Sequence, residues 1–346
     1  MPQPLALTQL SVPPTDAEVD AWAAVLTAAH AADLPGVPVP TRVEIAGRLR
    51  VAPTTGRFAH FAADEGVASL LLFTDAGNAH TASLDVLTVR PHARRRGTGT
   101  ALWHRVREEL LAQGRTSVST MADLGGAGQA FAESLGFENV LPLGWYVQDV
   151  QDVQDVQDVQ GGHDGQGGQD GHDVAAGPAT AEPELPAGYE LVCWEGLVPD
   201  AWVAAAAVAH GSMEDAPTGD MDEQPPAWTP ERLHTVQRLV LDRGGRMLMA
   251  AAMTPAGEVA AYTSLVLPDP AALRALQYDT VVVPAHRGRG LGRTVKLRML
   301  REATARFPAL REIATSVADE NTPMRAVNAA LGYRRERAAG IFQIKL

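Results

Sequence analysis

The chain has almost no cysteine: Cys193 is the single one in 346 residues. One thiol excludes a framework of disulfides within the chain and is typical of a protein in a reducing cytoplasm. Long hydrophobic runs are missing too, since the longest, residues 201–209, is far below the roughly 20 residues of a membrane-spanning helix. The chain also shows no basic and apolar leader of the signal-peptide kind. We therefore expect a cytoplasmic protein with no membrane partner.

Positive charge is scarce as well. Lysine and arginine number 29 against 41 aspartates and glutamates, which gives a formal net charge of −12. Nucleic acid is therefore disfavoured as a partner, because binding its phosphates needs cations gathered on one face. An apolar fraction of 46% is ordinary for a globular protein, and the length favours two domains.

The segment 148–187 lacks any period that a helix or strand could use to bury a face. It repeats Gln-Asp-Val and then runs through Gly, Gln, His and Asp. Such an acidic, aromatic-poor composition predicts a disordered, solvated linker between domains at 1–147 and 188–346. We expect no metal site there, because its histidines have no apolar scaffold.

Residues 278–293 are the most informative stretch of the chain. The β-branched run 280–283 predicts a strand, and Pro284 ends it because proline cannot donate to a sheet ladder. Glycines then alternate with arginines, and from Leu291 onward apolar residues recur with helical spacing. A glycine-rich turn that opens a helix presents unpaired N–H groups at the positive end of the helix dipole, which indicates a phosphate site.

The spacing of that turn excludes two common phosphate sites. It has neither the Gly-x-x-x-x-Gly-Lys-Ser/Thr of a P-loop nor the Gly-x-Gly-x-x-Gly of a dinucleotide site. A merely solvated arginine-rich turn is the alternative. Residues 84–99 nevertheless repeat the pattern, with Arg94-x-x-Gly97-x-Gly99 matching Arg287-x-x-Gly290-x-Gly292. The copies are 193 positions apart (287 minus 94), too far for a solenoid period, so they indicate duplicated domains.

A second shared feature lies downstream of each turn. A helix pattern ends in Leu-Gly-aromatic at residues 135–137 and again at 331–333. Asn321 precedes this helix in the second copy, whereas the first copy has Gly125 at that position. The turns and helix ends, in this order, resemble the GNAT acyltransferase superfamily in a tandem, two-domain form.

The resemblance implies an α/β (α+β) fold with two GNAT-like domains. Each would be a mixed, mostly antiparallel twisted sheet flanked by helices. In the first domain the expected order is helices, a three-stranded meander, the turn and its helix, a strand, a helix, and a last strand near 143–147 that completes the domain. The second domain is expected to repeat this layout from residue 188.

The resemblance also implies that the turns bind the diphosphate of acetyl-CoA or another acyl-CoA, while strand N–H groups bind pantetheine and polarise the thioester. A plain helix cap is the alternative role for Asn321. The residues expected to bind the cofactor are, in the second domain, Val281, Val282, Val283, Arg287, Gly288, Arg289, Gly290, Leu291, Gly292, Arg293 and Asn321, and in the first, Val89, Arg94, Arg95, Arg96, Gly97, Thr98 and Gly99.

Acyl transfer to an amine also needs a base for the ammonium group and an acid for the departing thiolate. Where the family usually has an acidic tyrosine on the last helix, this chain has Asn328 in one copy and Ala132 in the other. Asn328 can orient a substrate but cannot give up a proton. The family's usual base, a carboxylate on the central strand, corresponds to Asp85 in the first copy, where the second has Tyr278 with Asp279 beside it. Tyr278 is a candidate acid. A solubilising charge is the alternative role for Asp85, and a core aromatic for Tyr278.

Asp215 and Asp220 are the candidates for binding a cationic acceptor, with Asx-turns as the alternative. The sequence thus predicts an N-acetyltransferase acting on a primary amine of a small molecule, as a monomer or homodimer, with the second domain the better cofactor site. A non-catalytic acyl-CoA-binding or scaffold protein is one alternative. An amino-sugar thiol precursor, as in mycothiol synthase, is an alternative acceptor, although that enzyme type keeps the tyrosine missing here.

Overall fold

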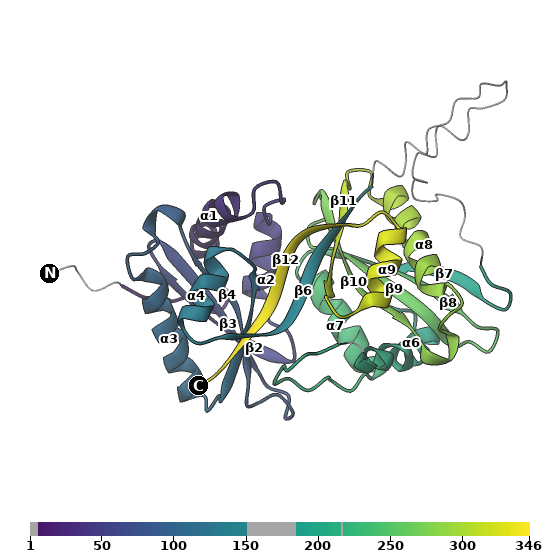
Figure 1. Ribbon diagram of the computed structural model, residues 1–346, viewed down its shortest axis with the longest axis horizontal. Helices are drawn as coiled ribbons and strands as arrows, with labels where there is room; N and C mark the ends of the chain where they lie inside the picture. The colour runs from purple at the N-terminus through teal and green to yellow at the C-terminus, as the bar shows by residue number, and fades with distance from the viewer. Residues whose placement is uncertain (1–5, 151–184, 216) are drawn as a thin grey trace, which may run out of the picture.

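The computed structural model describes residues 6–150, 185–215 and 217–346, and it shows two halves joined side by side (Figure 1). Most of the predicted linker, residues 151–184, lies outside the described residues. None of the helices in the described ranges has both the length and the apolar character needed to cross a membrane.

The first half follows the predicted order of helices, meander, turn and helix. Thr15 begins the first long helix through a capping box with Glu18, as its position before an apolar-periodic stretch predicts. The elements are β1 (Thr8–Gln9), α1 (Asp16–Asp33), α2 (Arg42–Arg50), β2 (Gly56–Ala63), β3 (Gly66–Phe73), β4 (Ala82–Val89), η1 (Pro91–Ala93), α3 (Thr98–Ala112), β5 (Ser117–Asp123), α4 (Ala127–Ser134) and β6 (Glu138–Asp149).

The second half repeats this layout. The elements are β7 (Glu190–Glu195), α6 (Asp200–Gly211), η2 (Ser212–Asp215), α7 (Pro230–Asp242), β8 (Arg246–Met253), β9 (Val259–Leu267), β10 (Arg274–Val282), η3 (Pro284–His286), α8 (Leu291–Arg306), β11 (Glu312–Ala318), α9 (Thr322–Ala330) and β12 (Arg334–Lys345). Helices cover both faces of each half. Apolar residues of α6 and α7 pack on one face of the second half, and those of α8 on the other.

The twelve strands of the described residues form one continuous sheet, in the order β1-β2-β3-β4-β5-β12-β6-β11-β10-β9-β8-β7. The last strand of each half is exchanged. β12 pairs with β5 of the first half, whereas β6 pairs with β11 of the second, and the two exchanged strands also pair with each other. In Figure 1 they cross the centre of the molecule as a yellow and a teal strand lying together. The strand predicted near 143–147 is present as part of β6, and it pairs with β11 and β12 rather than with β5.

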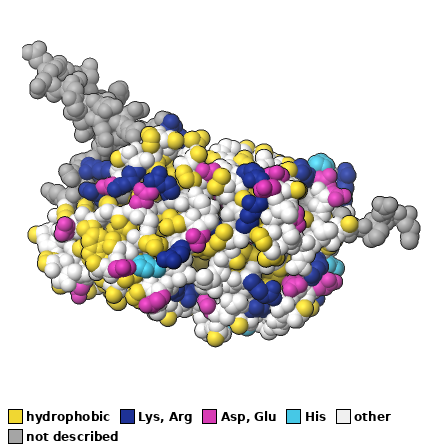
Figure 2. Space-filling view, turned by 180° about the vertical axis from the view of Figure 1, so that it is seen from behind, with side chains coloured by type: hydrophobic (Ala, Val, Ile, Leu, Met, Phe, Trp, Pro, Cys, Tyr) yellow, Lys and Arg dark blue, Asp and Glu magenta, His cyan; other side chains and the backbone are white. Residues whose placement is uncertain are grey.

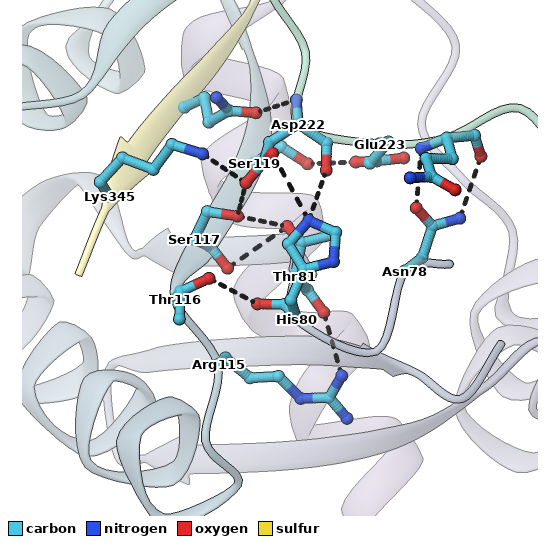
Figure 3. A network of polar contacts seen from close by, with 12 residues as sticks. Asn78, His80, Thr81, Arg115, Thr116, Ser117, Ser119, Asp222, Glu223 and Lys345 are labelled. Carbon is cyan, nitrogen blue, oxygen red and sulfur yellow. Dashed lines mark hydrogen bonds and ion pairs between the residues drawn. The ribbon is translucent and has the colours of Figure 1, made fainter. Parts of the chain in front are cut away.

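A loop of the second half also crosses to the first half, between η2 and α7 (Figure 3). Its contacts centre on Asp222, whose carboxylate accepts hydrogen bonds from Ser117 (2.7 Å) and Lys345, while its N–H donates to Gln343. Glu223 accepts a further bond from Ser119 at 2.9 Å. The two halves are thus held together by side chains as well as by the sheet.

Replacing Asp222 by asparagine should lower the free energy of unfolding at pH 7 by about 1–2 kcal/mol, because the Lys345 and Ser117 bonds to a charged group are lost or weakened. These partners, Lys345 first, lower the pKa of Asp222 from 3.8 to about 2. A lowered carboxyl pKa stabilises the fold above the unfolded value and loses that effect as the pH falls. The difference between wild type and Asp222→Asn should therefore shrink from about pH 4 to pH 2 in urea titrations. Asp220→Asn, in the same loop but exposed, is the control, and an equal effect there would contradict this account.

Candidate active site

The predicted glycine-rich turn follows β10 in the second half. Pro284 opens a single 3₁₀ turn, Gly290 adopts a left-handed conformation (φ 76°), and α8 begins at the next residue. Residues 287–290 are mostly exposed, and a Cβ atom on Gly290 would meet no atom within 4 Å. Residues 287–290 are therefore open to a ligand from solvent, as an anion site requires, whereas Leu291 and Gly292, which begin α8, are buried.

The first half contains the same turn. Gly97 is left-handed at φ 92° before α3, although Arg95 takes the left-handed conformation (φ 63°) where the second half has Gly288. A shallow pocket lined in part by Gly97, Thr100, Ala101 and His104 runs along the first two turns of α3. Both turns therefore have the conformation expected of a phosphate site.

The first arginine of each turn has a structural contact. Arg94 donates from Nε to the carbonyl of Val89 (3.0 Å), and Arg287 donates in the same way to Val282 (3.1 Å). Arg94 also forms a two-pronged ion pair with Asp33 at 2.7 and 2.6 Å. These two arginines brace the turn against the preceding strand, in addition to any charge that they present to a ligand.

The other arginines of the turns face outward. Arg289 donates to the hydroxyl of Tyr189 at 2.7 Å, and that hydroxyl lies 2.9 Å from Nδ1 of His286. Arg95, Arg96 and Arg293 are exposed. Around the same turns Val89 is half-buried, whereas Thr98, Leu291 and Gly292 are buried in the first turn of their helices. Asn321 caps α9, since its side chain accepts from the N–H of Met324 at 3.2 Å.

A gap opens in the sheet beside the second turn. β10 and β11 pair in parallel at only three positions, of which Leu276 with Ala314 is the last. The register between β10 and β9 then shifts between Gln277 and Thr280, which marks a bulge. Beyond this point β10 is no longer paired with β11 within the described residues, and this separation of the two strands is called the gap below.

The strand N–H groups divide between β9 and the gap. Val283 donates its N–H to the carbonyl of Ala260 at 3.0 Å, so this donor is already used. Because N–H groups alternate in direction along a strand, Val281 also faces β9 and Val282 faces the gap. Of the three valines expected to bind pantetheine, Val282 is thus the one whose N–H points away from β9, toward the gap.

Three side chains beside the bulge form a series of polar contacts, one hydrogen bond and one ion-pair contact. His210, at the end of α6 and only 5% exposed, lies between the hydroxyl of Tyr262, which contacts Nδ1, and the carboxylate of Asp279, which is 3.4 Å from Nε2. The ring of Trp228 covers His210 with 3.8 Å between centroids. The arrangement assigns the proton to Nε2, because the Tyr262 hydroxyl can donate to Nδ1 and the carboxylate needs a donor.

Asp279 forms the open end of this series, with 36% of its side chain exposed, whereas Tyr262 is 1% exposed. Burial, followed by the negative charge of Asp279, raises the pKa of Tyr262 well above its usual value, so the phenol keeps its proton. A carboxylate that is oriented by a buried histidine can act as a proton acceptor, that is, as a general base. Sequence reasoning noted Asp279 only as the neighbour of Tyr278, and it missed His210 and Tyr262, which look like a lone histidine on an alanine-rich helix and an aromatic in an apolar strand.

The predicted catalytic residues lie in different surroundings. Asp85 is paired with Arg48, whose Nη2 contacts both carboxylate oxygens at 2.8 and 2.9 Å. Tyr278 is 52% exposed and faces the positive charges of Arg48 and Arg243. Asn328 is fully buried. Asp85 and Tyr278 thus meet between the halves, apart from the Asp279 series.

Of the two acceptor candidates, Asp220 lies on the loop between η2 and α7 that crosses to the first half. Asp220 is exposed, and its N–H donates to the carbonyl of Val140 of β6 at 3.1 Å. Asp215 is the last residue of η2. On the face shown in Figure 2, acidic and basic side chains are interspersed over both halves, so the charges there are mixed rather than gathered by sign.

Comparison with known proteins identifies the family. The sequence profile of the Acetyltransferase (GNAT) family matches residues 32–137 and 213–333, so the chain belongs to this family, with one match in each half. A solved tandem GNAT protein from the clavulanic acid biosynthesis pathway is 26% identical, with a TM-score of 0.78 over 98% of both chains. An N-acetyltransferase of the family from Sphaerobacter thermophilus shares the fold (TM-score 0.65, 15% identity, 98% of this chain and 95% of that one). A search of curated protein sequences finds no match.

The predicted tandem GNAT fold is thereby confirmed. Membership of the family supports acyl-CoA-dependent N-acetyltransferase activity in general.

Proposed function

We propose that the second half binds acetyl-CoA and transfers the acetyl group to a primary amine of a small molecule. The observation that carries this proposal is the position of Asp279, which lies at the bulge where β10 leaves β11 and is oriented by His210. In the first half the position that matches Asp279 is Val86 (279 minus 193), and the neighbouring Asp85 is paired with Arg48. The first half therefore has no carboxylate at the position that Asp279 occupies in the second.

The reaction assigns a role to each group. The amine arrives as an ammonium ion, and Asp279 accepts one of its protons while His210 fixes the orientation of the carboxylate. The nitrogen then attacks the thioester carbon, whose oxygen is stabilised by strand N–H groups such as that of Val282. The open turn at Gly290 and the N-terminus of α8 would hold the diphosphate.

The acceptor enters from the face of the sheet that carries Asp279. Negative charge on this side attracts a cation, and Asp220 on the crossing loop is suited to the same role. An aminoglycoside-like compound, an amino sugar or another small amine would satisfy these requirements, and an amino-sugar thiol precursor is the alternative acceptor. The competing function, a non-catalytic acyl-CoA-binding or scaffold protein, predicts no turnover with any amine. Mass-spectrometric screening of acetyl-CoA consumption with pooled aminoglycosides, amino sugars, amino acids and polyamines separates these functions.

Replacing Gly290 by valine should weaken acetyl-CoA binding at least tenfold, because a β-branched residue is strained at φ 76° and its side chain would occupy the space that the diphosphate needs. Isothermal titration calorimetry measures this effect directly. Gly257→Val is the matched control: Gly257 has φ 82° in the β8–β9 turn of the same half, so it carries similar strain away from the gap. Unchanged binding in Gly290→Val together with loss in Gly97→Val would move the site to the first half.

A further inference from the structure

A buried lysine is connected through side-chain contacts to the point where β10 leaves β11. Lys296, on α8, is 3% exposed, and its Nζ donates to Oδ1 of Asn328, on α9, at 2.7 Å. The same Nζ lies 4.5 Å from the centre of the Tyr333 ring. The hydroxyl of Tyr333 in turn donates to Gln277 at 2.5 Å, and Gln277 is the first residue of β10 beyond the parallel pairing with β11. The lysine cluster therefore reaches the sheet where the strands begin to part.

In the cluster of Lys296, Asn328 and Tyr333, some hydrogen-bond donors have no acceptor. An ammonium group has three N–H donors, yet among the described residues Lys296 has one acceptor, the uncharged amide oxygen of Asn328. Nδ2 of Asn328, a fully buried residue, has no partner at all in the described structure. Unpaired buried donors are costly in a folded protein, so several at one place suggest that an acceptor arrives with a ligand.

Within the described ranges, no charged side chain pairs with Lys296 from the elements packed against it. Its neighbours are Asn328 from α9 and the phenol of Tyr333, whose pKa is raised by burial. Burial alone lowers the pKa of Lys296 from 10.5 to about 7. The group can therefore both hold and release a proton near neutral pH.

We propose that Lys296 donates a proton to the departing thiolate of coenzyme A, with Asn328 as the residue that positions it. This inference rests on the proposed function, since it assigns the acid to the reaction for which Asp279 is the base. Asp279 and Lys296 approach the gap from opposite faces of β10: Tyr262, the partner of His210, packs with α6 and α7, whereas Lys296 belongs to α8. The two proton transfers of the reaction thus have separate groups.

The protons balance over one turnover. The ammonium nitrogen loses one proton to Asp279, which passes it to water; the nitrogen then forms the C–N bond and loses its second proton to water as the C–S bond breaks. The sulfur accepts one proton from Lys296, which is then reprotonated from water. Amide and thiol are formed, and one proton is released to solvent.

The first test needs no acceptor. Binding of acetyl-CoA to wild type at pH 7.5, measured by calorimetry in two buffers of different ionisation enthalpy, should take up a fraction of a proton, because the ligand's acceptor atoms favour the protonated lysine. Lys296→Met, which keeps the length and apolar stem of the side chain, should bind without that proton uptake. Equal uptake in both proteins would overturn the assignment. No binding by wild type would instead refute the proposed function, so the two failures are distinguishable.

The second test is the pH profile of turnover with the best amine of the screen. Wild-type kcat should fall on the alkaline side as Lys296 deprotonates, whereas Lys296→Met should lose at least tenfold in kcat and lack that alkaline limb. Asn328→Leu should keep the limb but shift it, because its effect acts through the lysine. Wild-type kcat and an unaltered profile in Lys296→Met would contradict the proposal.

The folding of Lys296→Met is checked by unfolding in urea at a series of pH values. Because the folded pKa lies below the unfolded value, the unfolded chain binds more protons between about pH 7 and 10.5, and wild-type stability should rise over this range. Lys296→Met should lack that rise and be the more stable protein at pH 7. Loss of activity in a variant that is more stable cannot be attributed to unfolding.

Discussion

Replacing Phe342 by alanine is expected to lower the free energy of unfolding by about 3–5 kcal/mol, the usual cost of deleting a buried phenylalanine ring. Phe342 is fully buried, and although it lies near the C-terminus it packs in the core of the first half. Its strand, β12, pairs with β5 from Ala339 to Lys345. The damage should therefore appear in the half of the molecule that is remote in sequence.

Hydrogen exchange followed by mass spectrometry locates the effect. Phe342→Ala should lose protection in β4 and β5 before β8 and β9, whereas Leu273→Ala, at a 53% exposed position, should change neither stability nor exchange appreciably. If Phe342→Ala instead loses protection from exchange first around α8 and β9, the exchanged strand β12 does not stabilise the first half.

The exchange of β6 and β12 has a consequence for the intact molecule. A half produced alone would expose the edge of β5 or β11 and leave unpaired a strand that belongs to the other half, a situation that favours aggregation. The described loop contacts at Asp222 add to this coupling. Two family domains in tandem are thus joined as one cooperative structure through their last strands.

Sequence reasoning predicted the parts of the fold that local chemistry decides. Pro284 and Gly290 end a strand and open a helix because of their own backbone restrictions, and Thr15 begins a helix through its own hydroxyl. The partner of a strand is not local information. The run of mostly apolar residues at 143–147 predicts a strand, but it does not show whether the neighbour is β5 or β11.

The candidate active site also has parts that depend on local sequence and parts that depend on contacts between distant positions. The turns were predicted because each is a continuous motif, whereas the Asp279–His210 contact joins positions far apart in the chain and has no signature at either position. The role proposed for Lys296 could not be predicted from the sequence for a different reason. Among the arginines of its helix it looks like a solvated residue, yet α8 is buried on more than one side, since Val295, Lys296 and Leu297 are all buried.

Replacing Asp279 by asparagine is expected to lower kcat about 10²–10⁴-fold, the range that a positioned general base contributes, while acetyl-CoA binding stays within about twofold. The amide keeps the shape of the carboxylate but cannot accept a proton from the ammonium group. Steady-state kinetics with the best amine of the screen and calorimetry with acetyl-CoA measure the two quantities. Glu195→Gln, on the edge strand β7 with a similarly exposed carboxylate (34% against 36%), is the control and should retain wild-type kcat.

A substitution of His210 tests whether His210 and Asp279 act together. His210→Phe keeps a ring beneath Trp228 and Tyr262 but removes the contact between Nε2 and Asp279, so kcat should fall without loss of acetyl-CoA binding. If His210 acts only by orienting the carboxylate, the double variant Asp279→Asn/His210→Phe should be no slower than Asp279→Asn alone, because residues that act as a unit are not additive. A double variant whose loss equals the product of the single losses would show that the histidine has a separate role. A wild-type kcat in Asp279→Asn would place the base elsewhere, with Asp85 and Tyr278 between the halves as the next residues to test.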